Sequence, residues 1–128
     1  MTEVIKIDKH DGIGILTLNR PDSLNALTQE LARYIADSLI ELDRASDLSG
    51  IVLTGAGDRS FCAGVDLDEP LKIKIKEIEG WFGTICNIYR QILLTDKPVI
   101  AALNGVAAGG GFQIALVSDQ RIAHHQTK

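Results

Sequence analysis

Residues 98–118 contain no charged side chain, and this stretch constrains the fold more than any other part of the chain. About twenty apolar residues are enough to cross a bilayer as a helix, so a membrane span is the first possibility to test. The turn signal Asn104-Gly105 and the glycine run 109–111 both argue against a continuous helix. The amide of Gln113 would also lack hydrogen-bond partners in lipid. The stretch instead predicts a buried strand, a glycine-rich turn and a buried helix.

Short apolar strands alternate with amphipathic helical patterns along the whole chain. Two alternating segments around Asp11-Gly12 predict an opening β-hairpin. Apolar residues recur at helical spacing after Thr28, a plausible N-cap, and again over residues 78–94. The repeated order of strand, strand and helix predicts an α/β fold with parallel pairing, arranged as a coil of β-β-α units. The helix after Thr28 is expected to end near Ser46. Further strands are expected at residues 51–54, 61–63, 99–103 and 120–123, and a short further helix at about residues 110–117.

The composition is that of one ordinary domain. The 128 residues carry 13 Lys and Arg against 17 Asp and Glu, which gives a net charge of −4 and leaves no basic stripe for nucleic acid. A chain of this length buries roughly two thirds of its unfolded surface and needs neither disulfides nor metal. Cys62 and Cys86 lack ligand spacing, so we expect reduced thiols and no metal site. Because the first eleven residues include five charged side chains and no apolar secretory segment, we expect a cytoplasmic protein.

Two glycine-containing turns are the places where the sequence suggests chemistry. One comprises residues 62–67 and the other residues 104–113. Glycine lets the backbone approach a ligand closely, and the first N–H groups of a following helix have no partner within that helix. Two such turns that each aim one N–H at the same point form an oxyanion hole, which is worth roughly 2.7–4 kcal/mol per donor. The alternative is that both turns need glycine for packing alone.

Other chemistries fit the sequence less well. The segment Gly55-Ala56-Gly57-Asp58-Arg59-Ser60 resembles a dinucleotide-binding fingerprint, but Ser60 replaces the third glycine and a strand follows instead of a helix. No Gly-x-Ser-x-Gly elbow occurs. Cys62 has no nearby histidine to activate it and is expected to be a small buried apolar residue. We therefore expect no NAD and no other bound cofactor.

Three motifs in a fixed order carry a resemblance to a known family. They are Ile15-Leu16-Thr17-Leu18-Asn19-Arg20-Pro21 with Asn25-Ala26-Leu27, residues 61–67, and residues 98–111. This ordered set resembles the crotonase family of enoyl-CoA hydratases and isomerases over nearly the whole chain. The resemblance implies a thioester enzyme in which the N–H groups of Val65 and Gly110 hold the acyl-CoA carbonyl while enolate charge develops. It also implies substrate contacts, with coenzyme A present only as part of the substrate, at Asn25, Ala26, Leu27, Ala63, Gly64, Asp66, Leu67, Gly109 and Gln113.

The sequence also departs from the family pattern. Hydratases of this family carry a glutamate two residues after the glycine run, where this chain has Gln113. A side-chain amide has no proton to exchange near neutral pH, so Gln113 cannot act as a general acid or base. The second glutamate of the family would lie beyond Lys128, as would the helical part that supports trimer assembly. Residues 1–128 are therefore expected to be the N-terminal part of a single acyl-CoA-binding domain that is C-terminally truncated.

Two functions remain open from the sequence. The first is an enzyme of the enoyl-CoA hydratase/isomerase type, a lyase or isomerase of fatty acid metabolism that forms a homotrimer or a dimer of trimers at full length. A single carboxylate after Lys128 would favour double-bond isomerisation over hydration. The alternative is a non-catalytic fragment that binds CoA thioesters or another protein. The chain alone is expected to be inactive and to associate, because the strands at residues 99–103 and 120–123 lack the cover of later turns.

Overall fold

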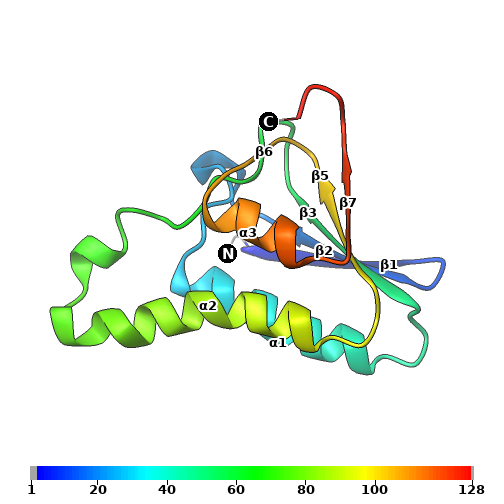
Figure 1. Cartoon of the computed structure of the whole chain (residues 1–128), viewed down its shortest axis with the longest axis horizontal. Helices are drawn as coiled ribbons and strands as arrows, with labels where there is room; N and C mark the ends of the chain where they lie inside the picture. The colour runs from blue at the N-terminus through cyan, green and yellow to red at the C-terminus, as the bar shows by residue number, and fades with distance from the viewer. Residues whose placement is uncertain (1–2, 128) are drawn as a thin grey trace.

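The structure is a computed structural model that describes residues 3–127 (Figure 1). Five strands form a mixed sheet in the order β1-β2-β3-β5-β7. Its first two strands pair antiparallel as the expected hairpin, and all later neighbours pair parallel. A second sheet pairs β4 (Ser60–Cys62) with β6 (Val106–Ala107). The five strands of the large sheet are β1 (Ile5–His10), β2 (Ile13–Leu18), β3 (Gly50–Gly55), β5 (Val99–Leu103) and β7 (Gln120–Ala123).

One α-helix follows each pair of strands in the described part of the chain. These helices are α1 (Gln29–Arg44), α2 (Ile78–Leu94) and α3 (Gly110–Val117). The order of two strands and a helix occurs three times before β7, which confirms the expected coil of β-β-α units. Short 3-10 helices, Pro21–Ser23, Pro70–Lys72 and Ile75–Glu77, lie in the connections.

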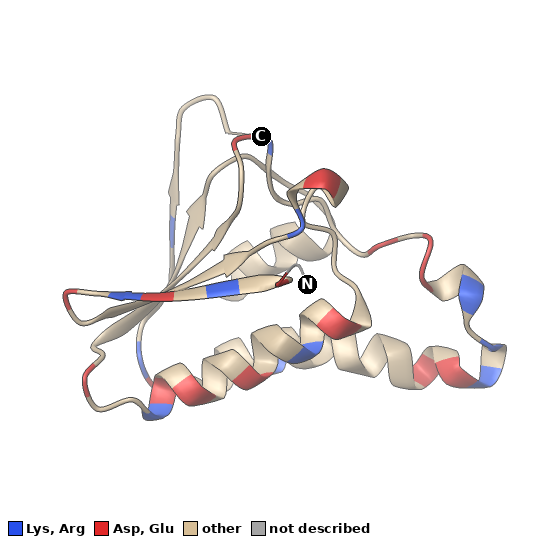
Figure 2. Ribbon diagram, turned by 180° about the vertical axis from the view of Figure 1, so that it is seen from behind, with Lys and Arg blue, Asp and Glu red and all other residues tan. Residues whose placement is uncertain are grey.

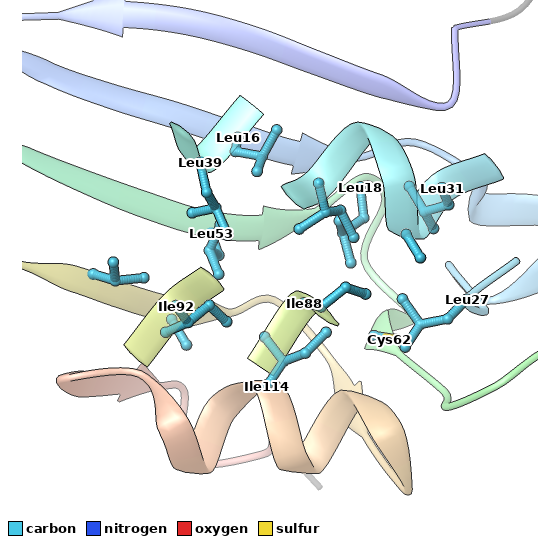
Figure 3. Packing of buried hydrophobic residues seen from close by; sticks show 14 of the residues in the cluster. Leu16, Leu18, Leu27, Leu31, Leu39, Leu53, Cys62, Ile88, Ile92 and Ile114 are labelled. Carbon is cyan, nitrogen blue, oxygen red and sulfur yellow. The ribbon is translucent and has the colours of Figure 1, made fainter. Parts of the chain in front are cut away.

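The hydrophobic core lies between the large sheet and the two long helices, α1 and α2, which pack side by side (Figures 1 and 3). Every second residue of β2 is buried, so Leu16 and Leu18 point into this core. Apolar residues of α1 face them at helical spacing, as the sequence predicts. Ile114 of α3 closes the same cluster. The other core residues labelled in Figure 3 are Leu27, Leu31, Leu39, Leu53, Cys62, Ile88 and Ile92.

Both ends of α1 are capped by side chains. The Oγ1 of Thr28 accepts a hydrogen bond of 3.1 Å from the N–H of Leu31, which confirms the predicted N-cap. At the other end, the Nζ of Lys97 donates to the carbonyl oxygens of Leu42, Asp43 and Ala45 at 2.9, 2.6 and 2.7 Å. A cation at this position satisfies the last carbonyls and opposes the negative end of the helix dipole. Lys97 thereby fastens the chain before β5 to the end of α1.

The structure differs from the sequence expectations in the last third of the chain. Strand β6 lies within the segment expected to be only a glycine-rich turn. The prediction that α3 is buried is wrong for one of its faces, because Phe112, Gln113 and Leu116 are exposed. All of β7 is exposed, and within residues 3–127 it pairs only with β5. These faces are open because no other described segment packs on them.

The segment between β4 and α2 extends away from the rest of the molecule, together with the first turns of α2 (Figures 1 and 2). It carries exposed apolar side chains, among them Leu71 and Ile75 at 83% and 92% exposure. Its lysines are exposed, and Figure 2 shows them among acidic residues instead of in a basic stripe. In the described part of the chain, no helix is both long and apolar enough to cross a membrane.

Candidate functional site

The two glycine-containing turns of the sequence come into direct backbone contact. Gly64 follows β4, Gly109 precedes α3, and both have positive φ, at +113° and +52°. A β-carbon added to Gly64 would lie 3.2 Å from the carbonyl oxygen of Ala108 and 3.5 Å from the nitrogen of Gly110. Glycine therefore permits both the backbone conformation and the close approach of the two turns.

The N–H of Val65 points away from Leu27, the residue with which Val65 pairs. Val65 forms an isolated parallel bridge with Leu27. In that bridge the N–H of Leu27 donates to the carbonyl of Gly64 at 2.8 Å, and the N–H of Asp66 donates to the carbonyl of Leu27 at 2.9 Å. In a trans peptide the N–H points opposite to the preceding carbonyl, so the N–H of Val65 points away from Leu27.

Gly110 is the first residue of α3 and presents its N–H outward from the helix end. The preceding carbonyl, that of Gly109, points into the helix, where it accepts from the N–H of Gln113 at 3.0 Å. The N–H of Gly110 is then one of the unpaired donors at the helix N-terminus. Across residues 3–127, neither this N–H nor that of Val65 donates to a backbone carbonyl. A β-carbon added to Gly110 would lie 3.6 Å from the Cγ2 of Val65, so the two donors come from adjoining turns.

Gly111 fixes the place at which α3 begins. A β-carbon on Gly111 would overlap the carbonyl group of Cys62, the last residue of β4. The N–H of Ala108 donates to that same carbonyl at 3.1 Å. The first turn of α3 therefore rests directly on β4, and the residues after β4 are held against the helix N-terminus.

Asp66 holds the turn that contains Val65. Its Oδ1 accepts from the N–H groups of Asp68 and Glu69 at 2.9 and 3.2 Å, and its Oδ2 lies 3.4 Å from the Nη2 of Arg20. Burial pushes the pKa of this carboxyl upward, but the two N–H donors and Arg20 outweigh burial and keep the pKa below its ordinary value. Asp66 therefore caps this turn, and its contact with substrate stays a prediction.

The loop at residues 25–27 supports the same turn from behind. Asn25 is fully buried with φ of +55°, and its amide donates to the carbonyls of Ala56 and Ser60 while its Oδ1 accepts from the N–H of Arg20. The hydrogen-bonding groups of the Asn25 side chain are thus used to join neighbouring segments of the chain. Substrate contact at Asn25, Ala26 and Leu27 stays a prediction for their backbone, and the predicted contacts at Ala63, Gly64, Leu67 and Gly109 lie on the adjoining turns.

No free carboxylate stands where the family's glutamate would be. Gln113 lies on the exposed face of α3. The carboxylate of Asp66 is engaged as described, and the Oδ2 of Asp119 accepts from the N–H of Val99 at 2.7 Å. Both carboxylates therefore hold the backbone in place.

Tyr89 is a further residue of this region, and the sequence predicts for it only a place in the helical apolar pattern of residues 78–94. It lies on α2 one turn after Ile85, and its hydroxyl is 3.4 Å from the carbonyl oxygen of Gly110. Burial, and then the nearby thiols of Cys86 and Cys62, raise the pKa of the phenol to about 12. Tyrosine carries a hydroxyl at the end of an apolar ring. Its presence in a row of apolar helix positions is the sequence signal that could have indicated a polar contact at Tyr89.

The remaining candidates for chemistry are inert or distant. Burial raises the pKa of the Cys62 thiol to about 11, which confirms a small buried residue instead of a thiolate nucleophile. Across residues 3–127, no three Cys, His, Asp or Glu side chains gather in a metal-binding arrangement. A groove of about 590 Å³ lies between β1 and α1, away from the two turns, and is lined by Glu3, Val4, Ile5, Ile7, Glu30, Tyr34, Ser38 and Glu41.

Comparison with known proteins shows the family of the chain. The family model described as enoyl-CoA hydratase/isomerase matches residues 8–128. A short-chain-enoyl-CoA hydratase of Clostridium acetobutylicum is 40% identical over 119 residues, which are 91% of this chain and 45% of that protein. A 1,2-epoxyphenylacetyl-CoA isomerase of Escherichia coli is 36% identical, over 100% of this chain and 50% of its own length.

Solved structures agree with the sequence matches. The crystal structure of an enoyl-CoA hydratase from Bacillus anthracis superposes with a TM-score of 0.92 at 30% identity, over 98% of this chain and 49% of that one. The chain thus spans about half the length of the relatives it matches. The matched residues include both glycine-containing turns and confirm the resemblance to the crotonase family. The chain belongs to the enoyl-CoA hydratase/isomerase family.

Proposed function

We propose that the protein acts on acyl-CoA thioesters as an enzyme of the enoyl-CoA hydratase/isomerase type, with the N–H groups of Val65 and Gly110 as its oxyanion hole. The observation that carries this proposal is the presence of two unpaired N–H groups on adjoining turns. In a buried site each such donor is worth roughly 2.7–4 kcal/mol toward developing charge. Coenzyme A takes part as a portion of the substrate, not as a separate cofactor.

The chemistry follows from where the charge develops. Removal of a proton beside the thioester carbonyl moves negative charge onto the carbonyl oxygen, and donors already aimed at that oxygen stabilise the enolate more than the neutral substrate. A base must take the proton, and neither Gln113 nor the engaged carboxylates of Asp66 and Asp119 can supply it. We propose that the base lies outside the described residues. One carboxylate there supports double-bond isomerisation, and two support hydration.

The assembly and setting of the whole protein belong to the same proposal. We propose a cytoplasmic enzyme of fatty acid metabolism that works as a homotrimer or as a dimer of trimers. The observation that supports assembly is the apolar surface left open on α3 and β7.

A non-catalytic CoA-thioester binder is the second candidate. It is favoured by Gln113 at the position of the family's glutamate. The oxyanion site would then hold a thioester without turning it over.

Isothermal titration of the chain with butyryl-CoA and with NAD tests the proposal. We expect the thioester to bind and NAD not to bind, because the site offers donors to a carbonyl and lacks a dinucleotide loop. Tight binding of NAD without binding of the thioester would contradict the proposal. Turnover of an enoyl-CoA by the full-length protein separates the enzyme from the non-catalytic binder.

A further inference from the structure

The hydroxyl of Tyr89 lies beside Gly110, one of the two residues of the proposed oxyanion hole. Its oxygen is 3.4 Å from the carbonyl oxygen of Gly110. A β-carbon added to Gly110 would lie 2.9 Å from that hydroxyl, 3.1 Å from the Cδ1 of Leu27 and 3.6 Å from the Cγ2 of Val65. The phenol reaches this place from α2, a different element from the two turns. Side chains from α2, from the loop at residues 25–27 and from the turn of Val65 thus surround the α-carbon of Gly110.

The donor capacity of this hydroxyl is barely used in the described structure. Burial keeps the phenol protonated well above neutral pH, with its pKa raised to about 12. An O–H···O hydrogen bond is strongest at 2.5–3.0 Å, so the 3.4 Å contact with Gly110 is a weak one. A protonated hydroxyl in a half-buried, largely apolar setting binds an oxygen with negative charge more strongly than a neutral carbonyl.

We propose that the Tyr89 hydroxyl is a third donor to the thioester oxygen, and that it turns from the carbonyl of Gly110 to that oxygen when negative charge develops there. This inference rests on the proposed function, and it assigns Tyr89 as a catalytic residue. A third donor of this kind implies a preference for anionic ligands that the two backbone N–H groups alone do not give. Tyr89 should matter for ligands whose thioester oxygen is anionic and should be nearly neutral for saturated thioesters.

Two ligands and two variants test this preference. Acetoacetyl-CoA is acidic between its two carbonyl groups and can bind as an enolate, which absorbs in the ultraviolet, whereas butyryl-CoA stays neutral. The variant is Tyr89→Phe, which removes only the hydroxyl. The control is Tyr34→Phe, since Tyr34 is the other tyrosine of the sequence and lies half-exposed on α1. Titration calorimetry measures both affinities, the enolate band reports the charge state, and circular dichroism checks the fold.

We expect Tyr89→Phe to weaken acetoacetyl-CoA binding by about tenfold or more, as for a hydrogen bond to a charged group, and to reduce the enolate band. Butyryl-CoA affinity should stay within about twofold of the unsubstituted chain, a change too small for a lost charged hydrogen bond. Tyr34→Phe should change neither. An acetoacetyl-CoA affinity that Tyr89→Phe leaves unchanged, or equal losses of affinity for both ligands, would overturn the inference. Failure of the unsubstituted chain to bind either thioester would instead overturn the proposed function, and the inference with it.

A second measurement needs no substitution at Tyr89. Isotope-labelled tyrosine gives two ring signals in NMR spectra, which Tyr34→Phe assigns. We expect the Tyr89 signal to shift strongly with acetoacetyl-CoA and weakly with butyryl-CoA. Identical responses of Tyr89 to the two ligands would contradict a donor that follows the charge.

Discussion

At the scale of single residues, Gly110 offers a way to remove one donor while the helix start stays intact. Proline is well tolerated at the first position of a helix, because that N–H has no partner in the helix, so Gly110→Pro deletes the donor while adding a β-carbon beside the Tyr89 hydroxyl. In the active full-length protein we expect the rate to fall by on the order of 10²–10³. Steady-state kinetics of a fold-checked variant gives the answer, and unchanged turnover would contradict the role of Gly110.

Gly110→Ala is the matched, milder change. Gly110 does not have a positive φ, so alanine is allowed by the backbone. Its β-carbon would meet the Tyr89 hydroxyl at 2.9 Å, which is the end of a side chain that can move. We expect a much smaller loss of rate than for Gly110→Pro, because the N–H remains.

Asp66 gives a prediction about pH. Its pKa lies below the ordinary value of 3.8, so the folded state binds this proton more weakly than the unfolded chain does. The ionised carboxylate therefore contributes stability above pH 3.8, and this contribution is lost as the pH falls through the folded-state pKa. Asp66→Asn should lower the free energy of unfolding by about 1 kcal/mol near neutral pH. Urea unfolding at several pH values should show the gap closing in acid, and a gap that widens in acid would contradict this account.

At the scale of elements, the packing of α3 on β4 depends on the absence of a side chain at Gly111. Gly111→Ala forces the helix away from the carbonyl of Cys62 and should cost about 1–3 kcal/mol in the free energy of unfolding. Gly83→Ala is the control, since Gly83 lies in α2 with no atom within 4 Å of an added β-carbon. There the same change should stabilise by roughly 0.5–1 kcal/mol. Thermal unfolding measures both, and equal effects would show that the contact with β4 is unimportant.

The elements themselves could be predicted because their signals are local. Alternation in β2, helical spacing in α1 and the Thr28 cap each lie within a few residues of the feature that they predict. Strand β6 escaped prediction because two residues between glycine turns carry no period. The half-exposed state of α3 escaped because a short helix in which Gln113 is the only polar side chain gives a weak signal of which face the protein covers.

The candidate site could be predicted only in its backbone part. Glycine runs mark the turns of Val65 and Gly110, because a turn is a local property of the chain. The approach of Tyr89 to Gly110, and of Lys97 to the end of α1, depends on how distant segments pack. Nothing in the residues near Tyr89 or Lys97 specifies those partners.

At the scale of the whole molecule, the open apolar surfaces predict association. Exposed apolar side chains lie on α3 and β7, including Phe112, Leu116 and Ile122 at 51%, 55% and 61% exposure. The outer edge of β7 has no partner strand within residues 3–127, and unpaired edges join other chains. Sizing chromatography should show concentration-dependent association, and Ile122→Lys should reduce it while Tyr34→Lys should not.

The same chain should be inactive in hydration of a short enoyl-CoA and in isomerisation of a 3-enoyl-CoA, because an oxyanion hole without a base does not move the proton. Clear turnover by a monodisperse monomer of 13.9 kDa would contradict both expectations. It would indicate an acid or base among the residues described above.

The central claim is that the N–H groups of Val65 and Gly110 bind the thioester oxygen, and amide NMR during titration with butyryl-CoA tests it most directly. We expect butyryl-CoA to shift these two amide protons downfield together and to slow their hydrogen exchange, and we expect NAD to leave both unchanged. Saturating binding of butyryl-CoA with no change at either amide would contradict it.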